Sequence, residues 1–220
     1  MTGVPDRLAG VLFDVDGTLV DTTYLHAVTW WEALRQGDHD VPMWTIHRAI
    51  GMGADKILDA LLGEDRDRDA DQKLADAHAA LYSTYWDRLR PLPGAADLLR
   101  ACKGAGRKVV LASSASEREL RALRRALDAD DVIDAATSAS DAEQSKPAPD
   151  ILGVALDRAG LAPDEVMLVG DSVWDIRAAA NLKIPCVAVT CGGTSAGELT
   201  GAGAVAVYRD PADLLANLEL

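Results

Sequence analysis

The segment Phe13–Asp21, FDVDGTLVD, places three aspartates directly after the apolar run Leu8–Phe13. A short apolar run that is bounded by polar residues predicts a buried strand. Acids at the end of such a strand are costly unless another group compensates their charge. Asp14 and Asp16 stand two positions apart, so on an extended chain their carboxylates point the same way. The segment therefore predicts an acidic site that groups from elsewhere in the chain complete.

Composition limits what such a site can bind. The chain has 220 residues, 49% of them hydrophobic, and a formal net charge of −13. A chain this acidic has little electrostatic reason to bind nucleic acid or an anionic membrane surface, whereas an acidic site suits a metal ion. No apolar stretch reaches the ~18 residues that a membrane span needs. The start of the chain, MTGVPDRLAG, has no signal-peptide pattern.

The spacing of cysteines and histidines indicates the expected location and the kind of metal. The three cysteines, Cys102, Cys186 and Cys191, do not have the spacing of a disulfide framework, so a reducing cytoplasm is the expected location. The four histidines form no HExxH pair and the chain contains no CxxC, which argues against zinc. An oxygen-bound divalent ion is the metal that the acidic segment suits.

Hydrophobic spacing divides the rest of the chain into a helical insert, residues 22–90, and an alternating region. The insert has no strand pattern, and its apolar stripes and glycine stops predict four helices, at 24–37, 42–50, 56–62 and 74–85. Four of the five tryptophans lie in the insert, and we interpret them as core rather than as a ligand platform.

The alternating region begins after the segment PLPG, residues 91–94. Its patterns predict strands at 108–112, 132–137, 166–170, 186–190 and 204–208, and helices at 95–103, 116–127, 149–159, 173–182 and 211–218. The helix at 116–127 opens with SERE, a capping-box pattern. Alternating strands and helices predict a parallel sheet that is covered on both faces. Ligands of such sheets bind beyond the carboxyl ends of the strands.

Polar residues follow several of these predicted strands. Ser113 and Ser114 follow the second strand, Lys146 follows the third, and Asp171 follows the fourth, with Asp175 four positions later. Two like charges that lie close together resist joint ionisation unless a cation is present. A divalent ion, most simply Mg²⁺, removes that cost.

Four motifs occur in order along the chain: DVDGT at 14–18, LASS at 111–114, SKPAPD at 145–150 and GDSVWD at 170–175. They resemble the four motifs of the haloacid dehalogenase superfamily, and the helical insert resembles its C1 cap. The resemblance spans nearly the whole chain, and the ordered set is more specific than any one motif. It implies an α/β fold with a Rossmann-like core, 1–20 and 92–220, and a four-helix cap, 21–91. It also implies Mg²⁺ dependence and phosphatase activity, as in the phosphoglycolate phosphatase and β-phosphoglucomutase-like subfamily.

The resemblance implies a role for each acidic residue of the motifs. Asp14 matches the nucleophile, whose attack on phosphorus gives an aspartyl-phosphate. Asp16 matches the general acid and base. Asp14, the backbone carbonyl of Asp16, and Asp171 match the Mg²⁺ ligands. Asp175 matches either a further ligand or a residue next to one.

The remaining motif residues match phosphate contacts, but each has a plainer interpretation. Ser113 and Lys146 match the groups that hold the phosphoryl oxygens, and Ser114 is either a phosphate contact or a backbone partner. Ser113 is otherwise an ordinary strand-end hydroxyl, and Lys146 a surface lysine before a proline-rich turn. Asp175 stands three residues after Ser172, so it also fits a capping-box acid. DVDGT alone fits an acidic turn.

Two residues of the insert are expected to face the substrate. His26 lies ten positions after Asp16 and Trp30 lies four further on, so on a helix they share a face. Both positions resemble those of β-phosphoglucomutase and related sugar-phosphate phosphatases, although His26 is equally well read as a hydrogen-bonded cap histidine. The small cap favours a small phosphorylated metabolite over a phosphoprotein, with no nucleic acid or membrane partner. The oligomeric state stays open.

Other activities make different demands on the sequence. A phosphosugar mutase must hold a second phosphate with a fixed cation, preferably arginine, and the matching position after the insert's glycine is Ala54. A C–X bond hydrolase lacks the second acid of the first motif, which is present as Asp16. A phosphonatase needs a cap lysine that forms a Schiff base, and no motif marks Lys56 or Lys73. A non-catalytic phosphate-binding module is expected to lack at least one of Asp14, Asp16, Lys146 and Asp171, and all four are present. Hydrolysis is therefore the preferred prediction.

Overall fold

The computed structural model describes residues 7–63, 65–66, 68–141 and 146–217. Its centre is a parallel sheet with the strand order β3-β2-β1-β4-β5-β6, so the predicted parallel α/β sheet is confirmed. The strands are β1 (Gly10–Phe13), β2 (Lys108–Ala112), β3 (Ala135–Thr137), β4 (Val166–Gly170), β5 (Cys186–Val189) and β6 (Ala206–Tyr208). Since β1 pairs with both β2 and β4, the acidic segment leaves the middle of the sheet.

Strand side chains alternate between two hydrophobic clusters, one on each face of the sheet. Phe13 belongs to one cluster and its neighbour Leu12 to the other, as the two-residue period of a strand requires. The first face is covered by α5 (Ala95–Gly104), α6 (Glu117–Leu127) and α10 (Pro211–Asn217). The second face is covered by α7 (Asp150–Ala159), α8 (Val173–Asn181) and α9 (Ala196–Ala202).

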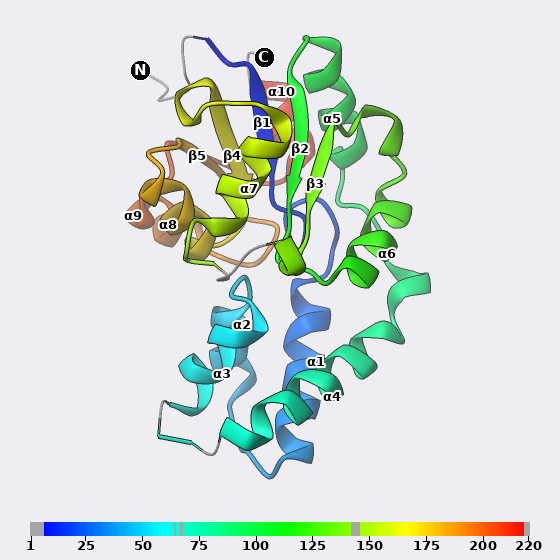
Figure 1. The fold of residues 1–220 in the computed structure, drawn as a ribbon, viewed down its shortest axis with the longest axis vertical. Coiled ribbons are helices and arrows are strands. Elements are labelled where there is room, and N and C mark those ends of the chain that lie inside the picture. The colour runs from blue at the N-terminus through cyan, green and yellow to red at the C-terminus, as the bar shows by residue number, and fades with distance from the viewer. Residues whose placement is uncertain (1–6, 64, 67, 142–145, 218–220) are drawn as a thin grey trace.

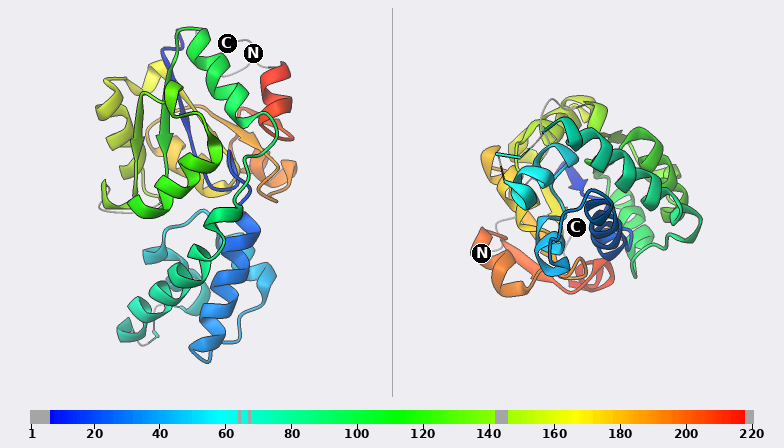
Figure 2. Two further views of the ribbon diagram at one scale, coloured as in Figure 1. Left: turned by 90° about the vertical axis from the view of Figure 1, so that its right-hand side faces the viewer. Right: turned by 90° about the horizontal axis from the view of Figure 1, so that it is seen from below.

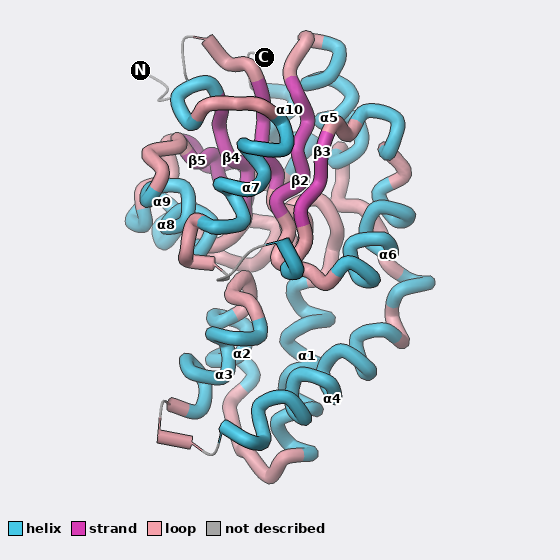
Figure 3. Tube along the Cα trace, viewed as in Figure 1, coloured by secondary structure: helices cyan, strands magenta, loops and turns pink. Residues whose placement is uncertain are grey.

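The helical insert lies beyond the carboxyl ends of the strands (Figures 1 and 2). The α-helices in its described residues are α1 (Thr23–Gln36), α2 (Met43–Ala49), α3 (Ala54–Leu62) and α4 (Asp71–Ser83). They pack around a third hydrophobic cluster that includes Trp30, Leu34 and Ile46. Figure 3 shows that this part of the molecule consists of helices and loops, whereas the strands lie together in the other part. The insert therefore faces the edge of the sheet where the motif residues emerge.

Two connections join the insert to the sheet, and they run side by side. The amide of Leu92 donates to the carbonyl of Leu19 at 2.8 Å, and the amide of Asp21 donates to the carbonyl of Arg90 at 3.0 Å. The exact division into a core, 1–20 and 92–220, and a cap, 21–91, stays a prediction. Residues 1–6, 64, 67, 142–145 and 218–220 of that division lie outside the described residues.

Several local predictions need correction. Apolar spacing on the first predicted helix, 24–37, suggested a buried face with Tyr24 and Val28, but both side chains are exposed. The buried face of α1 instead carries His26, Ala27 and Trp30. The helix itself is confirmed, because the spacing is helical on either face. Trp44 is 69% exposed, so the interpretation of the insert's tryptophans as core is wrong for that residue.

Two elements of the alternating region also differ from the prediction. The third strand covers only Ala135–Thr137, because a 3₁₀ turn, Asp130–Val132, occupies the start of the predicted run. Helix α9 was not predicted; its seven residues include two glycines, which are weak helix formers, and a capping box at Ser195 begins it. Among the described residues, no helix combines the length and the apolar character that crossing a membrane requires.

Candidate active site

Asp14 stands at the carboxyl end of β1, where its amide donates to the carbonyl of Val169 in β4 at 2.9 Å. Its Oδ1 pairs with Nζ of Lys146, and the same ammonium lies 2.7 Å from Oδ1 of Asp175. Lys146 is only 1% exposed, so the interpretation of it as a surface lysine is wrong. Burial lowers the pKa of Lys146, but the charges of Asp14 and Asp175 outweigh burial and raise it, which keeps the ammonium charged.

A third carboxylate completes this buried cluster. The Oγ1 of Thr18 lies 3.1 Å from Oδ2 of Asp14 and 2.9 Å from Oδ1 of Asp171. Carboxylate oxygens of Asp14, Asp171 and Asp175 all lie within 4.8 Å of one another. Burial, with the charge of Asp175, raises the pKa of Asp14 to about 7 although Lys146 opposes the shift, and burial raises the pKa of Asp171 well above its usual value. Such a set of oxygen ligands can hold a divalent cation.

Asp175 uses one carboxylate oxygen for its helix cap and the other for a contact with Lys146. Its Oδ2 accepts from the hydroxyl of Ser172 at 2.6 Å and from the amide of Ser172 at 3.1 Å, which forms the capping box of α8. Its Oδ1 meets Lys146. The capping-box interpretation is confirmed, and the second oxygen of the same carboxylate still faces the acidic cluster.

Asp16 turns toward the insert. Its Oδ1 accepts from the hydroxyl of Thr22 at 2.8 Å and lies 3.2 Å from Nε2 of His26. The same Nε2 lies 3.6 Å from Oε1 of Glu119, and the other ring nitrogen of His26 lies 3.2 Å from Nε2 of His78. Burial lowers the pKa of His26, but Asp16 and Glu119 outweigh it and raise that pKa, whereas burial and the charge of His26 lower the pKa of His78 well below its usual value.

The two serines of the second motif lie differently. Ser113 is fully buried, and its Oγ accepts from the amide of Ala115 at 3.0 Å. Ser114 and Asp14 both line a large cavity between the sheet and the insert. The Oγ of Ser114 is buried without a hydrogen-bond partner among the described residues. The roles of both serines as phosphate contacts stay predictions, and Ser145 of the third motif lies outside the described residues.

A cavity of about 780 Å³ lies between the sheet and the insert. Asp14, Asp16, Lys146 and Ser114 line it from the side of the sheet. The insert contributes an aromatic wall, in which Trp30 stacks on His78 with 4.2 Å between ring centroids and His26 stacks on Tyr82 at 4.0 Å; all four residues line the cavity. The structure therefore brings His26 and Trp30 to the same cavity as the motif acids.

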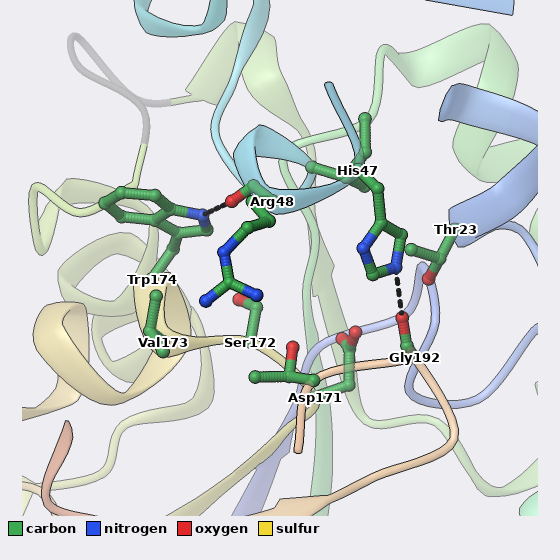
Figure 4. Close-up of a pocket in the computed structure, with 10 residues that line it drawn as sticks. Thr23, His47, Arg48, Asp171, Ser172, Val173, Trp174 and Gly192 are labelled. Atoms are coloured by element: carbon green, nitrogen blue, oxygen red, sulfur yellow. Dashed lines mark hydrogen bonds between the residues drawn. The ribbon is translucent and has the colours of Figure 1, made fainter. Parts of the chain in front are cut away.

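Helix α2 contacts the sheet side at a second, much smaller pocket (Figure 4). The Nε2 of His47 lies 3.2 Å from the carbonyl oxygen of Gly192, and the indole N–H of Trp174 donates to the carbonyl of Arg48 at 3.3 Å. The guanidinium of Arg48 pairs with Glu198 on α9. A Cβ on Gly192 would lie 1.7 Å from Oδ2 of Asp171, so this glycine is required for the loop to pass the carboxylate.

Sequence reasoning missed several residues of the site. Thr18 is part of DVDGT and its hydroxyl is a visible signal, but no partner could be named for it from the sequence. Glu119 was recognised only as the capping-box acid of SERE. Nothing local marked Gly192, because its importance comes from the approach of Asp171, which lies in a different loop.

Comparisons with known proteins agree with the family that the motifs resemble. A model of the haloacid dehalogenase-like hydrolases matches residues 8–183. A phosphoglycolate phosphatase of Nitrosospira multiformis is 30% identical over 191 residues, which are 83% of this chain and 84% of that protein. The crystal structure of a hydrolase from Pseudomonas syringae has a TM-score of 0.90 and 34% identity, covering 94% of this chain and 96% of that one. A β-phosphoglucomutase from Clostridium difficile, at 20% identity and a TM-score of 0.81 over 93% and 92% of the two chains, shares the fold.

Proposed function

The chain belongs to the haloacid dehalogenase-like hydrolase family, and we propose that it hydrolyses a small phosphorylated metabolite through an aspartyl-phosphate on Asp14. Family and curated relatives identify it as a phosphoric monoester hydrolase. The substrate is of the sugar-phosphate or phosphoglycolate type. The observation that carries the proposal is the position of Asp14, which lines the large cavity while Lys146 and two further aspartates surround it.

Asp14 and Lys146 are the proposed groups of the first chemical step. An oxygen of Asp14 attacks phosphorus, which splits a difficult hydrolysis into two easier displacements. The ammonium of Lys146 is fixed beside that carboxylate and stays charged. A preorganised cation at this place stabilises the charge that develops on the phosphoryl oxygens, and phosphoryl transfer depends mainly on such positioning.

Asp16 is the proposed general acid and base. It lines the same cavity as Asp14 and stands two residues further along the chain. In the first step its carboxyl group protonates the leaving oxygen of the ester. In the second step its carboxylate takes a proton from the water that attacks the aspartyl-phosphate, which restores both aspartates.

Asp14, Asp171 and Asp175 fit a Mg²⁺ ion, because their oxygens converge within 4.8 Å and two of their charges are not balanced by Lys146. We propose Asp14, the backbone carbonyl of Asp16, and Asp171 as the ligands, with Asp175 either as a further ligand or next to one. A bound Mg²⁺ would lower the electrostatic cost of bringing a phosphate dianion to a carboxylate.

The decisive experiment is phosphate release from a broad panel of phosphate esters in the presence of Mg²⁺. The panel contains sugar phosphates and 2-phosphoglycolate. Asp14→Asn is expected to lower kcat by about 10³-fold or more, because the variant lacks the proposed nucleophile. EDTA is expected to abolish wild-type activity. Full activity in EDTA would contradict the magnesium site, and an active Asp14→Asn variant would contradict the covalent route.

A phosphosugar mutase is the second candidate, favoured by the placement of His26 and Trp30 in the cavity wall. A mutase needs a cation for its second phosphate group. Ala54 lines the cavity where the resemblance expects an arginine, and Arg48 lies at the smaller pocket, paired with Glu198. Arg118 also lines the cavity, but its guanidinium lies over the ring of Trp86. We therefore expect β-glucose 1-phosphate with a trace of the bisphosphate to yield inorganic phosphate faster than glucose 6-phosphate. The reverse order of rates would favour the mutase.

A further inference from the structure

The carboxylate of Glu119 makes two different contacts, and only one of them belongs to its helix. Its Oε2 lies 3.3 Å from the amide of Ser116, and the hydroxyl of Ser116 accepts from the amide of Glu119 at 3.3 Å, which is the capping box of α6. Its Oε1 points to Nε2 of His26, 3.6 Å away. A helix cap needs no contact with the insert, so the second contact calls for a separate explanation.

The histidine stands between two carboxylates. Nε2 of His26 faces Oδ1 of Asp16 at 3.2 Å and Oε1 of Glu119 at 3.6 Å, and oxygens of both acids lie within 4.8 Å of each other and of that nitrogen. A nitrogen lone pair facing two carboxylates is repelled, so this arrangement holds Nε2 as an N–H donor. Glu119 comes from α6 on the sheet side, whereas His26 belongs to α1 of the insert.

We propose that Glu119 is a positioning residue that, through His26, orients the carboxyl group of Asp16 for protonation of the leaving oxygen. This inference rests on the proposed function. In the first step the bond from Asp14 oxygen to phosphorus forms and the bond from phosphorus to the ester oxygen breaks. The ester oxygen keeps that electron pair and receives the proton of Asp16. An oriented donor matters because the departing alkoxide is too basic to leave unprotonated.

Glu119→Gln separates this role from helix capping. Glutamine also serves in the third position of a capping box, so α6 keeps its cap while the charge that faces His26 is lost. Ser116→Ala is the matched control, because it removes the cap hydroxyl and keeps the carboxylate of Glu119. Asp16→Asn is the reference for loss of the acid itself.

The readout is kcat/KM for two esters, glucose 6-phosphate and p-nitrophenyl phosphate. This constant covers the reaction only up to the first phosphoryl transfer, so the later use of Asp16 as a base does not enter. The alcohol of glucose needs a proton to leave, whereas p-nitrophenolate does not. Glu119→Gln is expected to lower kcat/KM for glucose 6-phosphate about 10-fold, a part of the factor that general acids supply. The value for p-nitrophenyl phosphate should stay within about 2-fold, and Ser116→Ala should lower the unfolding midpoint without changing the ratio of the two constants.

A double variant tests the route through the histidine. If Glu119 acts through His26, Glu119→Gln combined with His26→Gln is no more selective against glucose 6-phosphate than His26→Gln alone. Equal losses for both esters in Glu119→Gln, while Asp16→Asn is selective, would overturn the inference. Equal losses in Asp16→Asn as well would instead contradict the acid role in the proposed function.

Discussion

At the scale of single residues, the site is defined by an imbalance of buried charge. Asp14, Asp171 and Asp175 bring three carboxylates together, and Lys146 supplies one ammonium beside them. With every group ionised, three negative charges and one positive charge leave two negative charges uncompensated. Buried charges without partners are expensive, and the raised pKa values of Asp14 and Asp171 express that cost.

The first prediction concerns magnesium and pH. Without metal, the folded state holds protons on Asp14 up to about pH 7 and on Asp171 well above its usual pKa of 3.8, whereas the unfolded chain releases them near pH 4. The metal-free stability is therefore expected to fall as the pH rises through this window. Mg²⁺ competes with those protons at about pH 5 and meets ionised carboxylates at about pH 8. We expect about 5 mM Mg²⁺ to raise Tm by about 4 °C more at the higher pH.

Thermal unfolding with and without Mg²⁺ at both pH values checks this prediction. Asp171→Asn is the matched variant, because it removes one of the two raised carboxyl groups and keeps the shape of the side chain. The rise in Tm that Mg²⁺ causes should be smaller in this variant and should depend less on pH. Equal gains at the two pH values in the wild type would show that these carboxyl groups do not bind the ion.

At the scale of elements, the glycines at the two ends of α5 differ in the space around them. Gly94 precedes the helix with φ of +76°, and a Cβ there would lie 2.6 Å from the Cα of Ala212 at the start of α10. Gly104 ends the same helix, and a Cβ there would meet nothing within 4 Å. The first glycine is required by the contact with α10, and the second is not.

The second prediction compares alanine at these two positions. Gly94→Ala is expected to lower the free energy of unfolding by about 3 kcal/mol, from the left-handed backbone and from the contact with Ala212. Gly104→Ala is expected to raise it by about 0.5 kcal/mol, because alanine is the better helix former. Chemical denaturation of both variants measures the two changes. A destabilisation of similar size at both positions would contradict the explanation by the left-handed backbone of Gly94 and its contact with α10.

At the scale of the whole molecule, the insert meets the sheet region through few polar contacts. His47 and Trp174 make two hydrogen bonds across the boundary, Arg48 pairs with Glu198, and His26 contacts Asp16 and Glu119. The pair of connections around Leu19–Asp21 and Arg90–Leu92 forms the covalent link. A single hydrogen bond or ion pair contributes little net free energy, so we propose that the insert moves against the sheet and excludes water when it closes.

The third prediction tests this movement by solution scattering. Adding Mg²⁺ and orthovanadate, a phosphate analogue, is expected to reduce the radius of gyration, because a ligand held from both sides favours the closed arrangement. Trp174→Phe removes the hydrogen bond to Arg48 and keeps an aromatic ring. It should increase the radius of gyration of the ligand-free protein and leave that of the ligand-bound protein unchanged. Identical scattering of the wild type in both conditions would argue for a fixed insert.

The sequence by itself determined the kind of each major element and the place of the acidic site. Periods of two and of about 3.6 residues depend on neighbours within a few positions, so β2 and β4 have the predicted bounds and α1 to α8 lie where spacing placed them. Asp14 and Asp171 were identified because acids directly after apolar strands are conspicuous. The short helix α9 was not predicted, because its glycines interrupt the periodic pattern of apolar residues.

Only the tertiary structure decided which residues meet. The order β3-β2-β1-β4-β5-β6 and the rotation of α1, which buries His26 and exposes Tyr24, depend on contacts between distant segments. Lys146 pairs with Asp14 across 132 residues of chain, and Glu119 reaches His26 from a different part of the fold. Local spacing carries no information about such pairs, because chain folding, not distance along the chain, sets the separation of side chains on different elements.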